Sequence, residues 1–106
     1  MLPREHRLRS SKEIREVISR GNRVSNSVAT LHYRTASSNR FAIVVSKAIG
    51  NAVQRNLVKR RVRAILSGHL VTKPKIEGVV RMRPGTASIE FDALRSELGR
   101  LLEKIK

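Results

Sequence analysis

Several residue types that stabilise or equip small proteins are absent or scarce here. The 106 residues include no cysteine and no tryptophan, and the only aromatic residues are Tyr33, Phe41 and Phe91. The absence of cysteine excludes a disulfide framework and a thiolate metal site. Three scattered aromatics do not build a surface on which successive bases stack. We therefore expect no sequence-specific reading of bases.

Acidic residues are scarce as well. Lysine and arginine number 23 against 8 acidic residues, which gives a net charge of +15 and a sequence pI near 11.8. Such a charge repels itself, and a polyanion relieves the repulsion by releasing its condensed counterions. The charge balance therefore predicts a nucleic-acid partner.

Groups that carry out catalysis are not gathered in the sequence. The eight acids form no close cluster, and the histidines His6, His32 and His69 are scattered. No nucleophile set, Gly-rich phosphate loop or metal-ligand spacing occurs. His32 is expected to be a sheet histidine and not a base.

Long apolar runs are missing. No run reaches the ~18 residues of a membrane span, and the polar start lacks the apolar core of a secretory signal. We therefore expect a cytoplasmic protein that has no membrane partner. The length fits a single domain, residues 1–106, in which residues 1–10 form a basic, irregular arm.

The spacing of apolar residues predicts an α/β (α+β) sandwich, in which helices pack on one small mixed sheet. A first helix begins after Ser10 in a capping box with Glu13 and ends at Gly21 in the left-handed conformation. Strands are predicted at residues 24–34, 41–46 and 79–83, and the second is expected in the centre because it is apolar on both sides. Helices are predicted over residues 51–66 and from about residue 88 onward.

The predicted helix 51–66 carries the strongest functional signal. At ~100° per residue it divides into two arcs. The apolar arc contains Leu57, Val58, Val62, Ala64, Ile65 and Leu66, with Arg61 falling inside it. The polar arc contains Arg55, Asn56, Lys59, Arg60 and Arg63. A solvated face normally mixes charges of both signs, but this arc has no acid. Because the planar fork of arginine binds two phosphate oxygens at once, the arc is interpreted as a phosphate-binding face.

The stretch Ser46 to Arg63, SKAIGNAVQRNLVKRRVR, resembles the signature of the bacterial ribonuclease P protein subunit. That family shows a strand ending in Val-Ser-Lys, then Gly-Asn-Ala-Val, Arg-Asn-Arg, and Lys-Arg followed by a further Arg. Leu57 stands where the family has the second arginine of Arg-Asn-Arg. Ile14 and Ile18 stand where the family usually has phenylalanine.

The resemblance implies a ribosomal-protein-like fold of order α-β-β-β-α-β-α with a left-handed β-α-β crossover. It also implies the protein subunit of an enzyme in which the RNA subunit is the catalyst and removes the 5′ leader of precursor tRNA. The isolated protein is then not an enzyme and binds no cofactor, and magnesium serves the ribozyme. The expected partners are ribonuclease P RNA and precursor tRNA, not DNA.

The resemblance assigns two sets of residues to these partners. The residues expected to contact the catalytic RNA are Lys47, Asn51, Arg55, Asn56, Lys59, Arg60 and Arg63. The residues expected to line a cleft for the leader are Arg7, Arg9, Ile14, Ile18 and Tyr33.

Four other classes of protein share some of these features. A small ribosomal or other structural RNA-binding protein fits the size and charge equally well. A helix-turn-helix DNA regulator is disfavoured because a strand, not a helix, precedes residues 51–66. A membrane-surface protein is disfavoured by the lack of tryptophan, and a protein nuclease by the missing carboxylate cluster.

Overall fold

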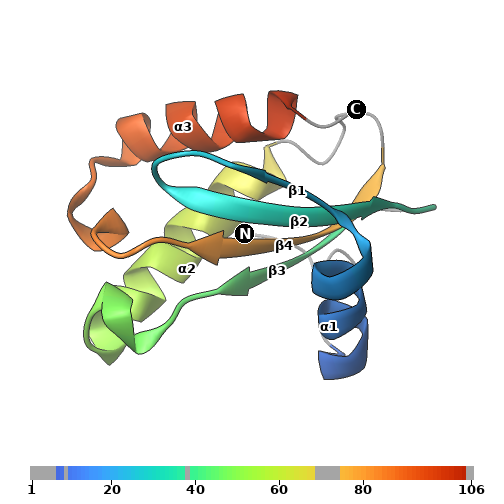
Figure 1. Cartoon of the computed structure of the whole chain (residues 1–106). Coiled ribbons are helices and arrows are strands. Elements are labelled where there is room, and N and C mark those ends of the chain that lie inside the picture. The colour runs from blue at the N-terminus through green and yellow to red at the C-terminus, as the bar shows by residue number, and fades with distance from the viewer. Residues whose placement is uncertain (1–6, 9, 38, 69–74, 105–106) are drawn as a thin grey trace.

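The structure is a computed structural model that describes residues 7–8, 10–37, 39–68 and 75–104 (Figure 1). Its helices are α1 (Ser11–Arg20), α2 (Ala52–Ser67) and α3 (Phe91–Glu103), with 3-10 turns η2 (Lys47–Ile49) and η3 (Thr86–Ser88). Its strands are β1 (Asn22–Ser25), β2 (Ala29–Thr35), β3 (Arg40–Val44) and β4 (Ile76–Met82). The order of helices and strands matches the order that the family resemblance implies.

The four strands form one mixed sheet in the order β1-β2-β4-β3. β2 pairs antiparallel with β1 and with β4, whereas β3 pairs parallel with β4. The connection between the two parallel strands runs through α2, which passes behind the sheet in Figure 1, and this crossover is left-handed. Because about 98% of such crossovers are right-handed, spacing and periodicity alone would have predicted the opposite hand.

The strand predicted to be central is an edge strand, which corrects the prediction. β3 is apolar on both sides because each of its faces is covered: Phe41 packs in one hydrophobic cluster and Ala42 in another. A strand that is buried on both faces has a covering layer on each face, but it need not lie in the centre of the sheet. The central, most buried strand is β4, in which every residue except Arg81 is buried.

Helices cover the two faces of the sheet unequally. The larger cluster lies between the sheet and the pair α2 and α3, where Leu31, Val62 and Leu98 are almost fully buried. The smaller cluster lies beneath α1 on the opposite face and contains Leu8, Val17, Ala42 and Val79. The two faces of the sheet thus belong to different layers of the fold.

The first helix begins at the predicted cap, Ser10, but without a full capping box, and it ends at Gly21 for a reason that differs from the predicted one. The Ser10 hydroxyl accepts a hydrogen bond from the Glu13 N–H at 3.4 Å, but the Glu13 carboxylate binds Arg40 and so does not complete the capping box. Gly21 is extended, with φ −80° and ψ 175°, and is not left-handed. A Cβ at Gly21 would lie 2.5 Å from the carbonyl oxygens of Tyr33 and Val17, so a close backbone approach requires glycine there.

Several boundaries also differ from the prediction. The single strand predicted at residues 24–34 is two strands, because the Asn26 side chain accepts hydrogen bonds from the N–H groups of Val28 and Ala29 and turns the chain. β4 begins at Ile76, earlier than predicted, and α3 begins at Phe91 after the turn η3. In the apolar arc of α2, Arg61 is explained by a hydrogen bond that its Nη1 donates to the Ile89 carbonyl at 3.0 Å.

The close approach at Gly21 yields a prediction. Gly21→Ala should lower the free energy of unfolding by about 1 to 3 kcal/mol, because the added methyl group forces two carbonyls apart. The matched control is Gly99→Ala in α3, where an added Cβ meets no atom within 4 Å. That change should raise the free energy of unfolding by up to about 1 kcal/mol, because alanine is the better helix former. Urea unfolding of both variants measures the contrast, and equal effects would contradict it.

Candidate nucleic-acid interface

The helix α2 is held in place by its first turn and its buried side. The Asn51 side chain accepts a hydrogen bond from the Gln54 N–H at 2.9 Å, and the Gln54 side chain accepts one from the Asn51 N–H at 3.0 Å. This capping box fixes the start of the helix. Val58, Val62 and Leu66 are buried against the larger cluster, so the opposite side of α2 faces solvent.

The solvent-facing side of α2 borders a hollow of about 550 Å³. The residues that line it, which we call the α2 face, are Val53, Asn56, Lys59, Arg60 and Arg63. Helix α2 contains no acidic residue. Within the described residues, no acidic side chain pairs with Lys59, Arg60 or Arg63. The α2 face therefore presents uncompensated positive charge.

Three other residues expected to contact the catalytic RNA, Lys47, Asn51 and Arg55, do not line this hollow. Arg55 is half-buried, does not line the hollow, and has a buried Nε atom that no described residue hydrogen bonds. Ala64, assigned to the apolar arc, is exposed. The predicted apolar arc was centred too close to Leu57 and Ala64. In the structure, the buried side of the helix is rotated toward Arg55. The Asn51 side-chain oxygen is engaged in the cap, and Lys47 is exposed in η2.

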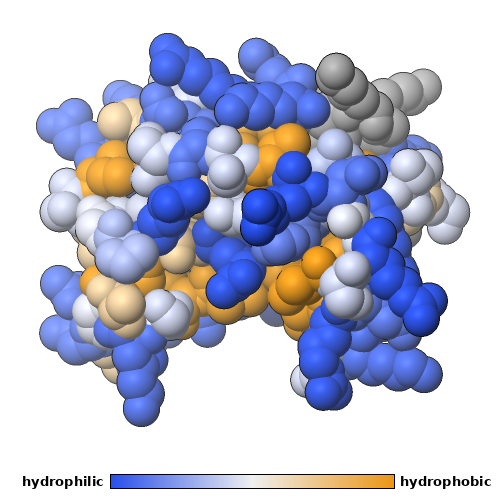
Figure 2. Space-filling model, in the orientation of Figure 1, coloured by the Kyte–Doolittle hydropathy of each residue, from blue (hydrophilic) through white to orange (hydrophobic). Residues whose placement is uncertain are grey.

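A second hollow, of about 260 Å³, lies beside α1 and is called the α1 groove. Its lining residues are Arg7, Leu8, Ile14, Phe41, Ala42, Ile43 and Arg63. The Leu8 N–H donates to the Phe41 carbonyl at 2.8 Å, and Arg7 forms a parallel bridge with Phe41. The described part of the N-terminal arm is thus tied to β3 and is not irregular. Figure 2 shows apolar surface in this region with hydrophilic side chains around it.

The cleft predicted for the leader forms only in part. Arg7 and Ile14 line the α1 groove, and Ile18 packs beside Ile14 against the smaller cluster. Tyr33 does not join them, which corrects the predicted grouping: it is 6% exposed, within the larger cluster on the opposite face of the sheet. The alternation along β2 was visible in the sequence, but which face α1 covers was not. Arg9 lies outside the described residues.

His32 is a buried β2 residue on the α1 side of the sheet that sequence reasoning did not assign to the site. It is 6% exposed, and no described residue hydrogen bonds its Nε2. Burial lowers the pKa of His32, and the positive charges of Arg81 and Arg23 lower it further. The imidazole is therefore neutral near pH 7 and adds no charge to this face.

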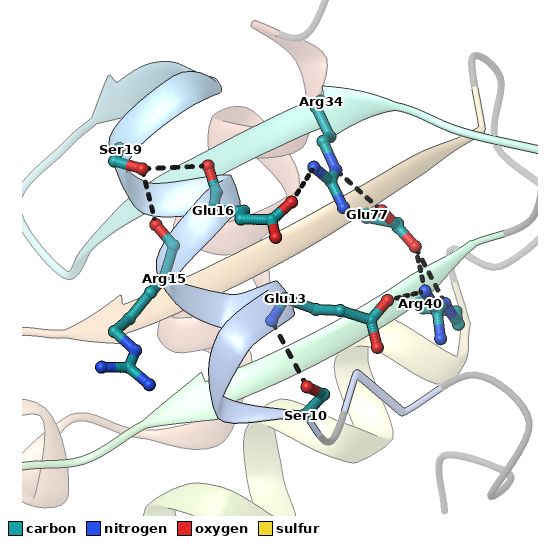
Figure 3. A network of polar contacts seen from close by, with 8 residues as sticks. All are labelled: Ser10, Glu13, Arg15, Glu16, Ser19, Arg34, Arg40 and Glu77. Atoms are coloured by element: carbon teal, nitrogen blue, oxygen red, sulfur yellow. Dashed lines mark hydrogen bonds and ion pairs between the residues drawn. The ribbon is translucent and has the colours of Figure 1, made fainter.

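A network of ion pairs joins α1 to the sheet (Figure 3). Glu77 of β4 lies between Arg34 of β2 and Arg40 of β3; it accepts from Arg34 Nε at 2.8 Å and from Arg40 Nε at 3.0 Å. Arg34 reaches Glu16 at 3.5 Å, and Arg40 reaches Glu13 at 2.6 Å. Both glutamates belong to α1, so one carboxylate of the sheet orients two arginines that hold the helix.

The network sets the ionisation of its members. Burial alone would raise the pKa of Glu77, but hydrogen bonds from Arg40 and Arg34, together with their charges, outweigh it and leave that pKa below its ordinary value. The hydrogen bond from each arginine to Glu77 in turn raises the pKa of Arg34 and of Arg40. Sequence reasoning missed the network because Glu77 lies 43 residues from Arg34 and 37 from Arg40.

Neither a metal centre nor a membrane-spanning helix is found in the part of the chain that the structure describes. There, no three histidine or acidic side chains are placed to hold a metal ion together. None of the helices has the length and apolar character needed to cross a membrane. The chemistry of the two hollows is thus that of cations beside apolar surface.

Comparisons with known proteins bear on the family and the fold. A family model described as Ribonuclease P matches residues 2–106. The ribonuclease P protein component of Corynebacterium diphtheriae is 35% identical over 99% of this chain and 97% of its own length. That of Kocuria rhizophila is 38% identical over 89% of this chain and 86% of its own length. The solved structure of the RNase P protein from Thermotoga maritima is 28% identical, with a TM-score of 0.85, over 94% of this chain and 97% of that chain.

The Glu77 network yields a prediction about pH. Glu77→Gln should lower the free energy of unfolding at pH 7 by about 1 to 3 kcal/mol, because two arginines lose a charged acceptor. Since the folded pKa of Glu77 is lowered, the stabilisation is fully present above the ordinary pKa of 4.5 and is lost as the pH falls through the folded value. Unfolding curves at several pH values should show wild type and variant converging in acid. A gap that stays constant with pH would contradict this, and Glu103→Gln, at an exposed carboxylate of α3, is the control.

Proposed function

The chain belongs to the ribonuclease P protein family, and on that premise we propose that it binds the catalytic RNA through the α2 face and the 5′ leader of precursor tRNA in the α1 groove. The bound RNA carries out the cleavage, and the protein contributes binding. The enzyme is thus a ribonucleoprotein endonuclease that matures the 5′ end of tRNA. We place it in the cytoplasm, where its RNA partners are made.

The observation that carries this proposal is the unpaired charge of the α2 face. Lys59, Arg60 and Arg63 project from one side of a helix that has no acid, and no described acid pairs with them. Like charges one turn apart are unfavourable in isolation. A phosphate backbone removes that repulsion and adds charge-assisted hydrogen bonds from the guanidinium groups.

The α1 groove suits a single strand of RNA for a different reason. Its lining combines apolar groups, such as Ile14 and Ile43, with the cations Arg7 and Arg63. Apolar surface packs against the faces of unpaired bases, and cations bind the phosphates of the backbone between them. Among the described lining residues, none is Asn, Gln, Asp or Glu, and we assign the two arginines to the phosphates and not to base edges. We therefore propose that the groove holds a leader of any sequence.

Magnesium belongs to the RNA in this proposal. When bound, the ions supply charge stabilisation and activate water at the scissile phosphate. This chain's part is to lower the repulsion between two polyanions, because its cations lie between the catalytic RNA and the leader. Closer approach of the two RNAs then favours the ion sites that they share.

Changes on the α2 face test the first half of the proposal. Lys59→Ala and Arg60→Ala should each weaken binding to ribonuclease P RNA. Each should also flatten the plot of log affinity against log salt by up to ~1 unit for every phosphate that the variant no longer neutralises. Stability should barely change, because both side chains point away from the core. Filter binding at several salt concentrations gives the slopes, with Arg95→Ala on α3 as a control. Unchanged slopes together with a lower melting temperature would show that α2 does not face the RNA.

Changes in the α1 groove test the second half. Arg7→Ala should weaken binding of leader-bearing precursor tRNA to the reconstituted holoenzyme several-fold more than binding of mature tRNA. Arg15→Ala removes the same charge from the exposed side of α1, outside the groove, and should affect the two RNAs equally. Tyr33→Phe should change neither affinity, because Tyr33 lies in the core of the opposite face. If Arg7→Ala weakens the binding of precursor tRNA and of mature tRNA by the same factor, the leader does not occupy this groove.

A further inference from the structure

Arg63 lies where the two hollows meet. It lines the α2 face together with Asn56, Lys59 and Arg60, and it also lines the α1 groove together with Arg7 and Ile14. Among the described residues, no other lines both of these hollows. A ligand in either hollow therefore comes within reach of the same side chain.

The guanidinium of Arg63 is available to a ligand. Arg63 is half-exposed, and within the described residues no acidic side chain pairs with it. Arg34 and Arg40 differ from Arg63, because each of them binds two carboxylates of the ion-pair network that joins α1 to the sheet. A guanidinium has five N–H donors directed along a planar fork, enough for oxygens of two separate phosphates.

We propose that Arg63 bridges the two RNAs, donating to a phosphate of the catalytic RNA with one edge and to a phosphate of the single-stranded leader with the other. This inference rests on the proposed function and adds a coupling between its two halves. An RNA on the α2 face fixes the Arg63 side chain at the mouth of the α1 groove. The leader then meets an ordered donor and does not bear the entropy cost of ordering a long side chain.

Neighbouring cations do not meet the requirements of a bridge. Of these two hollows, Lys59 and Arg60 line the α2 face and not the α1 groove, and Arg7 lines the α1 groove and not the α2 face. A lysine in place of Arg63 keeps the charge but carries it as a compact ammonium group, without the planar fork. The bridge therefore depends on both the position and the chemical identity of Arg63.

A coupling of this kind is reciprocal, because each ligand changes the affinity for the other by the same factor. The experiment measures the affinity of wild-type and variant protein for ribonuclease P RNA, with and without bound precursor tRNA. It also measures the affinity of each holoenzyme for precursor and for mature tRNA. The variants are Arg63→Ala, Arg63→Lys, Arg60→Ala and Arg7→Ala, and their melting temperatures are recorded.

The expected pattern separates the residues. Arg63→Ala should weaken binding to ribonuclease P RNA and also reduce the preference for precursor over mature tRNA, each by about five- to tenfold. Arg63→Lys should largely retain affinity for ribonuclease P RNA and lose the preference for precursor. Arg60→Ala should weaken only the binding of ribonuclease P RNA. Arg7→Ala should weaken only the binding of leader-bearing precursor tRNA.

Other outcomes overturn one proposal or both. If Arg63→Ala acts like Arg60→Ala alone, or like Arg7→Ala alone, Arg63 does not bridge, and the proposed function stands. If Arg63→Lys retains the full preference for precursor, the planar fork is not needed and the bridge is wrong. If neither Arg60→Ala nor Arg7→Ala has an effect, the proposed function fails together with the bridge.

Discussion

The burial of β4 on both faces is the constraint on which the rest of this structure depends. A strand with apolar groups on both sides must be covered twice, and the chain covers one face with α2 and α3. Among the described helices, α1 alone covers the other face, together with Leu8 of the N-terminal arm. A helix is about 10 Å wide with its side chains, whereas seven residues of strand extend about 23 Å at ~3.3 Å each. The end of the second face near Arg81 therefore stays exposed, and the α1 groove lies beside α1 along β3.

The few acids are used where helices must be held, which leaves the cations of α2 unpaired. Glu13, Glu16 and Glu77 join α1 to the sheet, and four more acids, Glu90, Asp92, Glu97 and Glu103, lie in or beside α3. None lies in α2. The cations of α2 are thus separated from the acids, whereas α1 and α3 carry charges of both signs. This separation produces a binding face although no single residue in it is unusual.

Local features of the sequence predicted local structure well. Capping residues located the starts of α1 and α2, and alternation in β2 separated Leu31 and Tyr33 from His32 and Arg34. What could not be predicted is set by contacts between distant segments. The edge position of β3, the side of the sheet that α1 covers and the partners of Glu77 all depend on how the layers assemble.

The same limit applies to the two hollows. The charge of the α2 face follows from the sequence alone, because spacing along one helix decides it. The boundary of the α2 face does not follow from the sequence, because the rotation of the helix depends on what the helix packs against. In the structure, this rotation places Arg55 toward the buried side. The grouping of Arg7 and Ile14 came from the family resemblance. Their meeting with Arg63 required the chain to bring three separate segments together.

The place of β4 in the sheet also determines when the protein can fold during its synthesis. β4 lies between β2 and β3, yet it is the last of the four strands to leave the ribosome. Until residues 76–82 emerge, β2 and β3 have no partner between them, and the pairs they eventually form with β4 span 37 to 53 residues. Closing such distant pairs is slow, and the apolar strands remain exposed meanwhile. Before that point the emerging chain is a strongly basic polymer without a complete sheet, held on a ribosome rich in RNA. The defined binding surface forms only after β4, and α3 behind it, have emerged.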